Sequence, residues 1–95
     1  MAAYLIVELE VTDAGAFEEY RKQVPGIIAK YGGKYLVRGG KTETLEGGWS
    51  PKRVVVLEFP GLEQAKKFYD SPEYAAPKAL RLRAATSKMI LAEGA

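Results

Sequence analysis

The side chains best suited to chemistry are one arginine and two glutamates that interrupt apolar, strand-like segments. Arg38 ends the run YLVR before two glycines, and Glu8 and Glu58 lie in the runs AYLIVELEV and RVVVLEF. A guanidinium can hold a carboxylate, an enolate or a phosphate. A glutamate in a partly apolar cleft can gain a raised pKa and act as an acid or base. The alternative is a salt bridge without chemistry, since buried charges need partners.

A ligand could also contact a glycine, a tryptophan and a tyrosine. Gly39 would allow close approach of the backbone. Trp49 lies in the segment EGGWSPK, a predicted loop, where it could close a pocket, with simple packing as the alternative. Tyr74 follows no clear helical periodicity and carries a phenol hydroxyl. The predicted ligand-binding set is therefore Arg38, Gly39, Trp49, Glu58 and Tyr74, and the catalytic candidates are Arg38, Glu58 and Glu8.

The composition excludes several classes of site. The chain has no cysteine and no histidine, so disulfides, thiol nucleophiles, cysteine–zinc sites and histidine bases are ruled out. Carboxylates do not cluster, and we expect neither a metal nor a cofactor. The 14 basic and 12 acidic residues are interspersed and give a net charge of +2. We therefore expect no nucleic-acid partner, which would need a clustered basic face.

The periodicity of apolar residues predicts a single domain over residues 1–95 with alternating strands and helices. Asp13 and Ser71 are expected helix N-caps. Pro25 is expected to kink or break its helix near Val24, and Pro77 is expected to limit its helix. The glycines after Arg38 predict a bulge within the second strand. In chain order we expect a strand at 3–11, a helix at 12–33, an interrupted strand at 34–48, a loop at 46–52, a strand at 53–59, a helix at 60–70, helical runs from 71 to 85, and a strand at 86–93.

This β-α-β-β-α-β order predicts an α+β fold of the ferredoxin-like type, with an antiparallel sheet covered by helices on one face. The other face is also apolar by alternation, and no element remains to cover it. A second copy of the chain is the expected cover, because closed two-fold dimers are the commonest oligomers. We expect this open face to carry Tyr4, Ile6, Val54 and Val56 together with Arg38, Glu8 and Glu58.

Three segments resemble a bacterial family called domain of unknown function 1330. They are YGGKYLVRGG (31–40), LEGGWSPKRVVVLEFP (45–60) and FYDSPEYAAPKALRLRAA (68–85). The resemblance implies membership of the dimeric α+β barrel superfamily, in which two ferredoxin-like subunits pack sheet against sheet. Relatives in that superfamily include antibiotic-biosynthesis monooxygenases, muconolactone isomerases, stress-responsive proteins and haem-binding chlorite dismutases. Fold alone does not carry their chemistry to this chain.

The resulting hypothesis is a homodimeric barrel that binds or transforms a small organic molecule without a cofactor. Its pocket would be on the sheet face, either between the sheet and the helices or at the dimer seam. Arg38 would hold the ligand, and a glutamate or tyrosine would exchange protons. The alternatives are a non-catalytic ligand-binding or stress-related module, and a purely structural dimer whose charges fix the register. No apolar run reaches membrane-spanning length, and Glu8 and Glu10 interrupt the first one. We therefore expect no membrane association and a cytoplasmic location.

Overall fold

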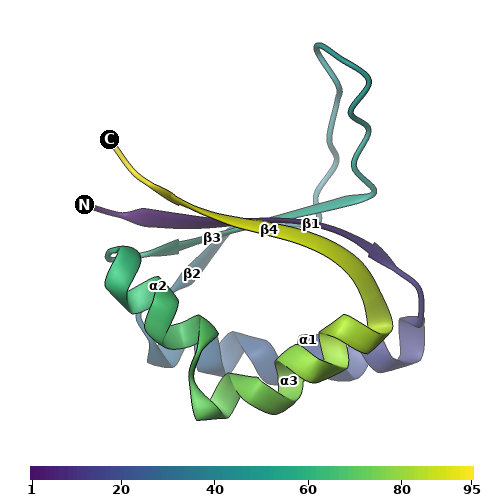
Figure 1. The fold of residues 1–95 in the computed structure, drawn as a ribbon. Coiled ribbons are helices and arrows are strands. Elements are labelled where there is room, and N and C mark those ends of the chain that lie inside the picture. Colours follow the sequence, from purple (N-terminus) through teal and green to yellow (C-terminus); the bar gives the residue numbers. More distant parts are fainter.

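A computed structural model describes residues 1–95 as a four-stranded antiparallel sheet with all helices on one face (Figure 1). The strands lie in the order β2-β3-β1-β4, which confirms the predicted α+β ferredoxin-like arrangement. No helix is long and apolar enough to span a membrane. The elements are β1 (Ala3–Val11), α1 (Ala14–Lys30), β2 (Lys34–Arg38), β3 (Arg53–Phe59), α2 (Leu62–Tyr69), α3 (Pro72–Ala84) and β4 (Ala85–Glu93).

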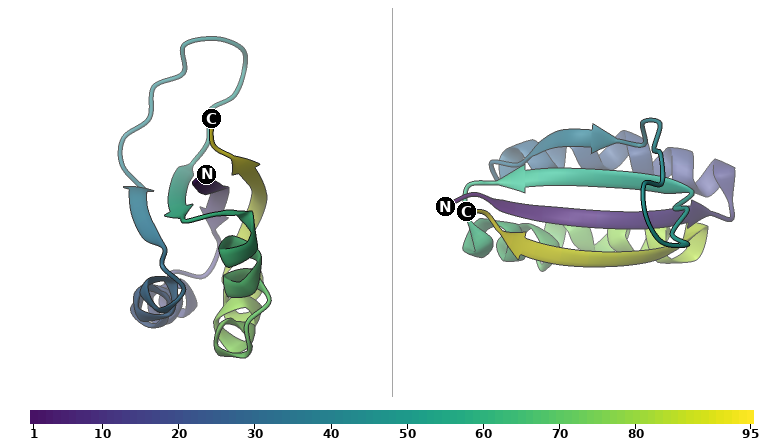
Figure 2. Two further views of the ribbon diagram at one scale, coloured as in Figure 1. Left: turned by 90° about the vertical axis from the view of Figure 1, so that its left-hand side faces the viewer. Right: turned by 90° about the horizontal axis from the view of Figure 1, so that it is seen from above.

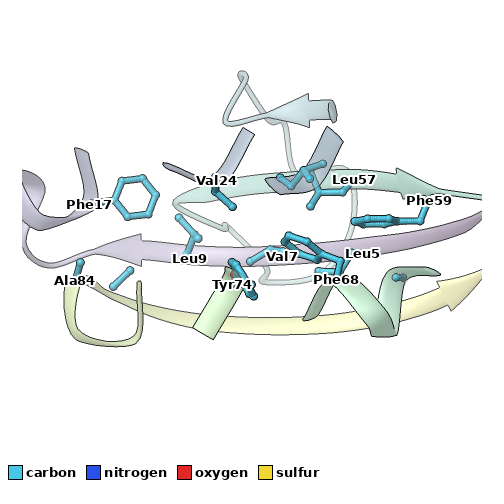
Figure 3. Packing of buried hydrophobic residues seen from close by; sticks show 13 residues of the cluster. Leu5, Val7, Leu9, Phe17, Val24, Leu57, Phe59, Phe68, Tyr74 and Ala84 are labelled. Carbon is cyan, nitrogen blue, oxygen red and sulfur yellow. The ribbon is translucent and has the colours of Figure 1, made fainter. Parts of the chain in front are cut away.

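The core lies between the sheet and the helices. Alternate residues of β1 point towards the helices, because successive side chains of a strand face opposite sides. Leu5, Val7 and Leu9 are buried there (Figure 3). Aromatic rings from α2 and α3 pack against them, with the ring centroids of Phe68 and Tyr74 4.5 Å apart. The core therefore joins both layers through the central strand.

The other face of the sheet carries no helix, as Figure 2 shows from above. The register places Ile6 between Val56 of β3 and Ile90 of β4. Ile90 is 63% exposed. The predicted apolar composition of this open face is confirmed for β1 and β3, since Tyr4 and Val54 also point to it.

Helix α1 begins where predicted and continues through its proline. The side chain of Asp13 accepts a hydrogen bond from the amide of Ala16, at 3.1 Å, which caps the first turn. Of the kink or break predicted near Val24, the break does not occur, although Pro25 lacks an amide hydrogen. Val24 and Ile28 are buried on either side of it, so packing against the core holds the helix together.

Helix α3 likewise contains its proline. Ser71 caps the helix as predicted, accepting a hydrogen bond from the amide of Tyr74. The prediction that Pro77 limits the helix is wrong, because α3 runs on to Ala84. Tyr74, Pro77, Arg81 and Ala84 are all buried at helical spacing. Burial of this stripe stabilises the helix through the proline.

Strand β2 is shorter than predicted and contains its bulge at another place. Tyr35 pairs with Leu57 and Val37 pairs with Val56, so Leu36 is one extra residue in the ladder. The predicted bulge at the glycine pair after the strand is therefore wrong. A one-residue shift moves every following side chain to the opposite face of a sheet.

The segment 39–52 is a loop rather than a continuation of β2 to residue 48. It rises from the sheet on the side away from the helices (Figure 1). Gly39 and Gly47 have positive φ angles of 72° and 76°, a conformation that ends a strand. The hydroxyl of Thr44 donates to the carbonyl of Trp49 at 2.6 Å within the loop.

Candidate anion-binding site

The charged candidates lie on opposite faces of the sheet, so the prediction that all three share the open face is wrong. Glu8 and Glu58 do lie on the open face. Arg38 pairs with Val55, whose side chain points towards the helices. The cause is the bulge at Leu36, which moves Arg38 to the helix face. Arg38 therefore cannot pair with these glutamates within one subunit.

Glu58 already has partners within its own sheet. Its carboxylate lies 3.1 Å from the ammonium of Lys34 on the neighbouring strand. Hydrogen bonding to Glu58 and its negative charge raise the pKa of Tyr4 on the other side. This arrangement fits the structural salt bridge better than an acid–base group. Glu8 lies opposite Lys88 in the register, without an ion pair.

On the helix face, three guanidinium groups gather from different elements. Arg21 comes from α1, Arg38 from the end of β2 and Arg53 from the start of β3. Burial and then the charges of Arg21 and Arg38 lower the pKa of Arg53, so the three groups repel one another. We call these residues the arginine cluster.

The arginine cluster has little internal compensation. Glu18 forms an ion pair with Arg21 at 3.3 Å, and no carboxylate forms one with Arg38 or Arg53. The Nε atoms of Arg21 and Arg53 are buried without a hydrogen-bond partner. Unmatched buried donors and like charges cost free energy, so the cluster favours a bound anion.

Aromatic rings and a glycine hold the cluster in place. The guanidinium of Arg38 lies 4.5 Å from the centroid of the Tyr35 ring, and that of Arg53 lies 5.7 Å from Phe17. A Cβ atom at Gly39 would approach the Arg53 guanidinium to 2.4 Å. The group that closely approaches the backbone at Gly39 is thus the guanidinium of Arg53.

A cavity lies beside the cluster, between the sheet and the helices. Its volume is about 40 Å³, and it is lined mostly by apolar side chains of the sheet and of all three helices. Tyr35 lines the cavity and also carries Arg38 on its ring. Burial raises the pKa of Tyr35, while the positive charges of the arginine cluster act against that rise. Tyr35 therefore connects the cavity with the cluster.

Four polar side chains reach the cavity wall, namely Tyr20, Tyr35, Tyr74 and Arg81. The hydroxyl oxygens of Tyr20 and Tyr74 lie 2.9 Å apart. Arg81 donates from Nε to the Tyr74 oxygen at 3.3 Å and from Nη1 to the hydroxyl of Ser87. Burial raises the pKa of Tyr20 well above its ordinary value of 10.0, so this phenol keeps its proton at neutral pH.

The five predicted ligand-binding residues thus separate into two groups. Tyr74 lines the cavity, and Arg38 and Gly39 belong to or contact the arginine cluster. Glu58 and Trp49 lie on the other side of the sheet, where Trp49 is 60% exposed beside Ile6. No group of three or more acidic side chains that could hold a metal ion occurs in the chain.

Sequence reasoning missed Arg21, Arg53 and Tyr35, and it assigned Tyr20 to the core. Two signals were available. In RVVVLEF, Arg53 has the same parity as Leu57, which points inward. Arg81 follows Tyr74 by two helical turns and so shares its buried stripe. Nothing in the sequence indicated that Arg21 would meet them.

Similar folds occur in several solved structures. A protein of unknown function from Rhodopseudomonas palustris has a TM-score of 0.79 at 18% identity, covering 99% of this chain and 82% of that one. A dimeric ferredoxin-like protein of unknown function from Jannaschia sp. CCS1 has a TM-score of 0.72 at 13% identity, covering 99% and 100%. SnoaB, a cofactor-independent oxygenase from Streptomyces nogalater, has a TM-score of 0.68 at 11% identity, covering 99% and 93%. At these identities the likeness concerns the fold.

None of the curated proteins compared with the chain matches it. A family model does match, over residues 2–95, and this range includes every strand and helix of the fold and all members of the arginine cluster. The chain therefore belongs to the family described as Domain of unknown function (DUF1330).

Proposed function

We propose that the chain is a cytoplasmic homodimer that binds a small organic acid between its sheet and its helices. The arginine cluster would hold the acidic group, and the cavity beside Tyr35 would receive the adjoining part of the molecule. The observation that carries this proposal is the convergence of three guanidinium groups, of which only Arg21 has a carboxylate partner, Glu18.

The dimensions limit the ligand. The cavity of about 40 Å³ is only a few times the roughly 10–15 Å³ that one water molecule needs on the same measure. Without movement of the lining side chains, only a small group enters it. The rest of the ligand would lie at the exposed guanidinium of Arg38.

Binding is favoured over conversion of the ligand. No carboxylate lines the cavity, and the glutamates predicted as acid–base groups lie on the other face of the sheet. A cofactor-free reaction is the second candidate, favoured by the hydrogen-bonded phenols of Tyr20 and Tyr74. SnoaB, a cofactor-independent oxygenase, has a similar fold and so offers a precedent for such chemistry. Its support for the second candidate is limited to this likeness of fold.

The homodimer is proposed on the open sheet face. Apolar side chains of three strands lie there without cover, among them Ile6, Val56 and Ile90. The similar protein from Jannaschia sp. CCS1 is dimeric. A stable monomer at micromolar concentration would count against this part of the proposal.

Calorimetric titration with 4-methylpentanoate and its neutral amide tests ligand binding. We expect the acid to bind and the amide to bind at least about tenfold more weakly, because charge-assisted hydrogen bonds contribute about 1.5–3 kcal/mol each. Arg38→Ala should weaken binding of the acid by a similar factor. Arg83→Ala is the matched control, because Arg83 is an exposed arginine on α3 outside the cluster. Equal binding of acid and amide, or no effect of Arg38→Ala, would refute the proposal.

A further inference from the structure

Arg81 is a buried cation without an anionic partner. Its side chain belongs to a residue that is 2% exposed, and no carboxylate forms an ion pair with it. Its hydrogen bonds go to two neutral hydroxyls, those of Tyr74 and Ser87. An isolated buried charge is costly. The positive charge of Arg81 therefore polarises the two hydroxyl groups to which it donates.

The direction of the hydrogen bonds follows from the chemistry of the groups. An arginine Nε can only donate, so the Tyr74 oxygen accepts from it. Tyr74 is 1% exposed, and its only other polar partner is the hydroxyl of Tyr20. Its own proton must go to Tyr20, since a buried donor without an acceptor costs about 1–3 kcal/mol. The Tyr20 oxygen is then an acceptor in this bond.

The hydroxyl proton of Tyr20 is left without an acceptor in the protein. Its hydroxyl has no hydrogen bond other than the one with Tyr74. Apart from the tyrosines and Arg81, the lining of the cavity is apolar. The acceptor for this proton must therefore come from whatever occupies the cavity.

We propose that Arg81, Tyr74 and Tyr20 form a chain that delivers one polarised hydrogen-bond donor, the Tyr20 hydroxyl, to a ligand oxygen in the cavity. This rests on the proposed function and deepens it. The ligand is then an acid that carries a second oxygen acceptor, such as the carbonyl of an oxo acid. The raised pKa of Tyr20 agrees with a role as donor rather than base at neutral pH. Tyr20 is a ligand-binding residue here, and Arg81 acts through it as a positioning residue.

The first test compares oxo acids with methyl-branched acids of the same shape. Levulinate and 4-methylpentanoate form one such pair, and pyruvate with isobutyrate forms a shorter one. For at least one pair, we expect the oxo acid to bind about 2–10-fold more tightly, the usual net effect of one neutral hydrogen bond. Tyr20→Phe should abolish this preference and leave the affinity for the methyl-branched acid unchanged. Arg38→Ala should weaken both acids equally.

The outcomes separate the two proposals. If the methyl-branched acids bind and no oxo acid is preferred, the donor proposal is overturned and the arginine site stands. If neither type of acid binds, the proposed binding of organic acids is refuted, and with it the proposal that the ligand is an oxo acid. Loss of all binding in Tyr20→Phe would assign Tyr20 a packing role and also overturn the donor proposal.

The second test needs no ligand. Neutron diffraction from crystals of the deuterated chain locates the hydroxyl deuterons. We expect the Tyr74 deuteron on the line between the two phenol oxygens and the Tyr20 deuteron directed into the cavity. A Tyr20 deuteron on that line, directed at Tyr74, would overturn the proposal whatever the binding results.

Discussion

On the open face of the sheet, Glu58 has the ammonium of Lys34 at 3.1 Å and raises the pKa of Tyr4. On the helix face, Arg38 and Arg53 form no ion pair with an acidic residue, and burial followed by the charges of Arg21 and Arg38 lowers the pKa of Arg53. The same sheet thus carries a compensated charge on one side and an uncompensated cluster on the other. Compensated charges fix a register, whereas like charges held together cost stability and are typical of binding sites. In the proposed function, self-association therefore belongs to one face and ligand binding to the other.

The largest expected effect comes from placing a charge on the open face. Val56→Asp should raise the dimer dissociation constant by about 100-fold or more, because burying an unpaired carboxylate costs several kcal/mol. Light scattering should then give a mass near 10.4 kDa instead of twice that value. Leu82→Asp is the matched control, since Leu82 is 62% exposed on α3. If the dimer tolerates Val56→Asp, the open face is not the surface through which the subunits associate.

The next largest effect concerns the support of the arginine cluster. Gly39→Ala should lower the free energy of unfolding by about 1–3 kcal/mol, since it combines a positive φ with contact between the new methyl group and Arg53. Gly40→Ala should be nearly neutral, because no atom lies within 4 Å of its added Cβ. Urea unfolding of both variants measures the difference. Equal stabilities would mean that Arg53 is not fixed by the glycine.

Removing a charge should have opposite effects on the two faces. Arg53→Met should leave stability unchanged or raise it, because it removes an unpartnered Nε and relieves repulsion while keeping the apolar stem. Glu58→Gln should lower stability by about 0.2–1 kcal/mol through loss of the ion pair with Lys34. Thermal unfolding at neutral pH compares them. A clear destabilisation by Arg53→Met would make the cluster structural.

The smallest effect concerns the ion pair between Glu73 and Lys30, which joins two helices. Glu73 of α3 is bonded to Lys30 and Tyr31 of α1, and hydrogen bonding from Lys30 lowers its pKa from 4.5 to about 2. A lowered pKa in the folded state gives stability that is complete above the ordinary pKa and is lost as pH falls through the folded value.

Glu73→Gln should therefore remove the part of the acid sensitivity that falls between about pH 4.5 and pH 2. Unfolding midpoints measured at several values across that interval test this expectation. Glu63→Gln serves as a control on the neighbouring helix α2, where the carboxylate is only paired with Lys67 on the surface. An unchanged pH profile in Glu73→Gln would contradict the assignment.

The sequence was sufficient for the order of strands and helices, the helix caps and the apolar open face, because these depend on local patterns. It was insufficient at Pro25 and Pro77, where burial of the flanking residues outweighs the lost hydrogen bond. It was also insufficient for Arg38. Alternation holds only up to the bulge, which precedes Arg38. The bulge depends on pairing with β3, which no local pattern contains.

The bulge also has a genetic consequence. Loss of the single codon for Leu36 would remove the extra residue, restore regular pairing and keep Arg38 opposite Val55 on the helix face. If the four residues from Tyr35 to Arg38 were all paired regularly instead, Arg38 would lie opposite Val54 on the open face. Relatives with one residue rather than two between Tyr35 and Arg38 should therefore carry the arginine on the same face as this chain.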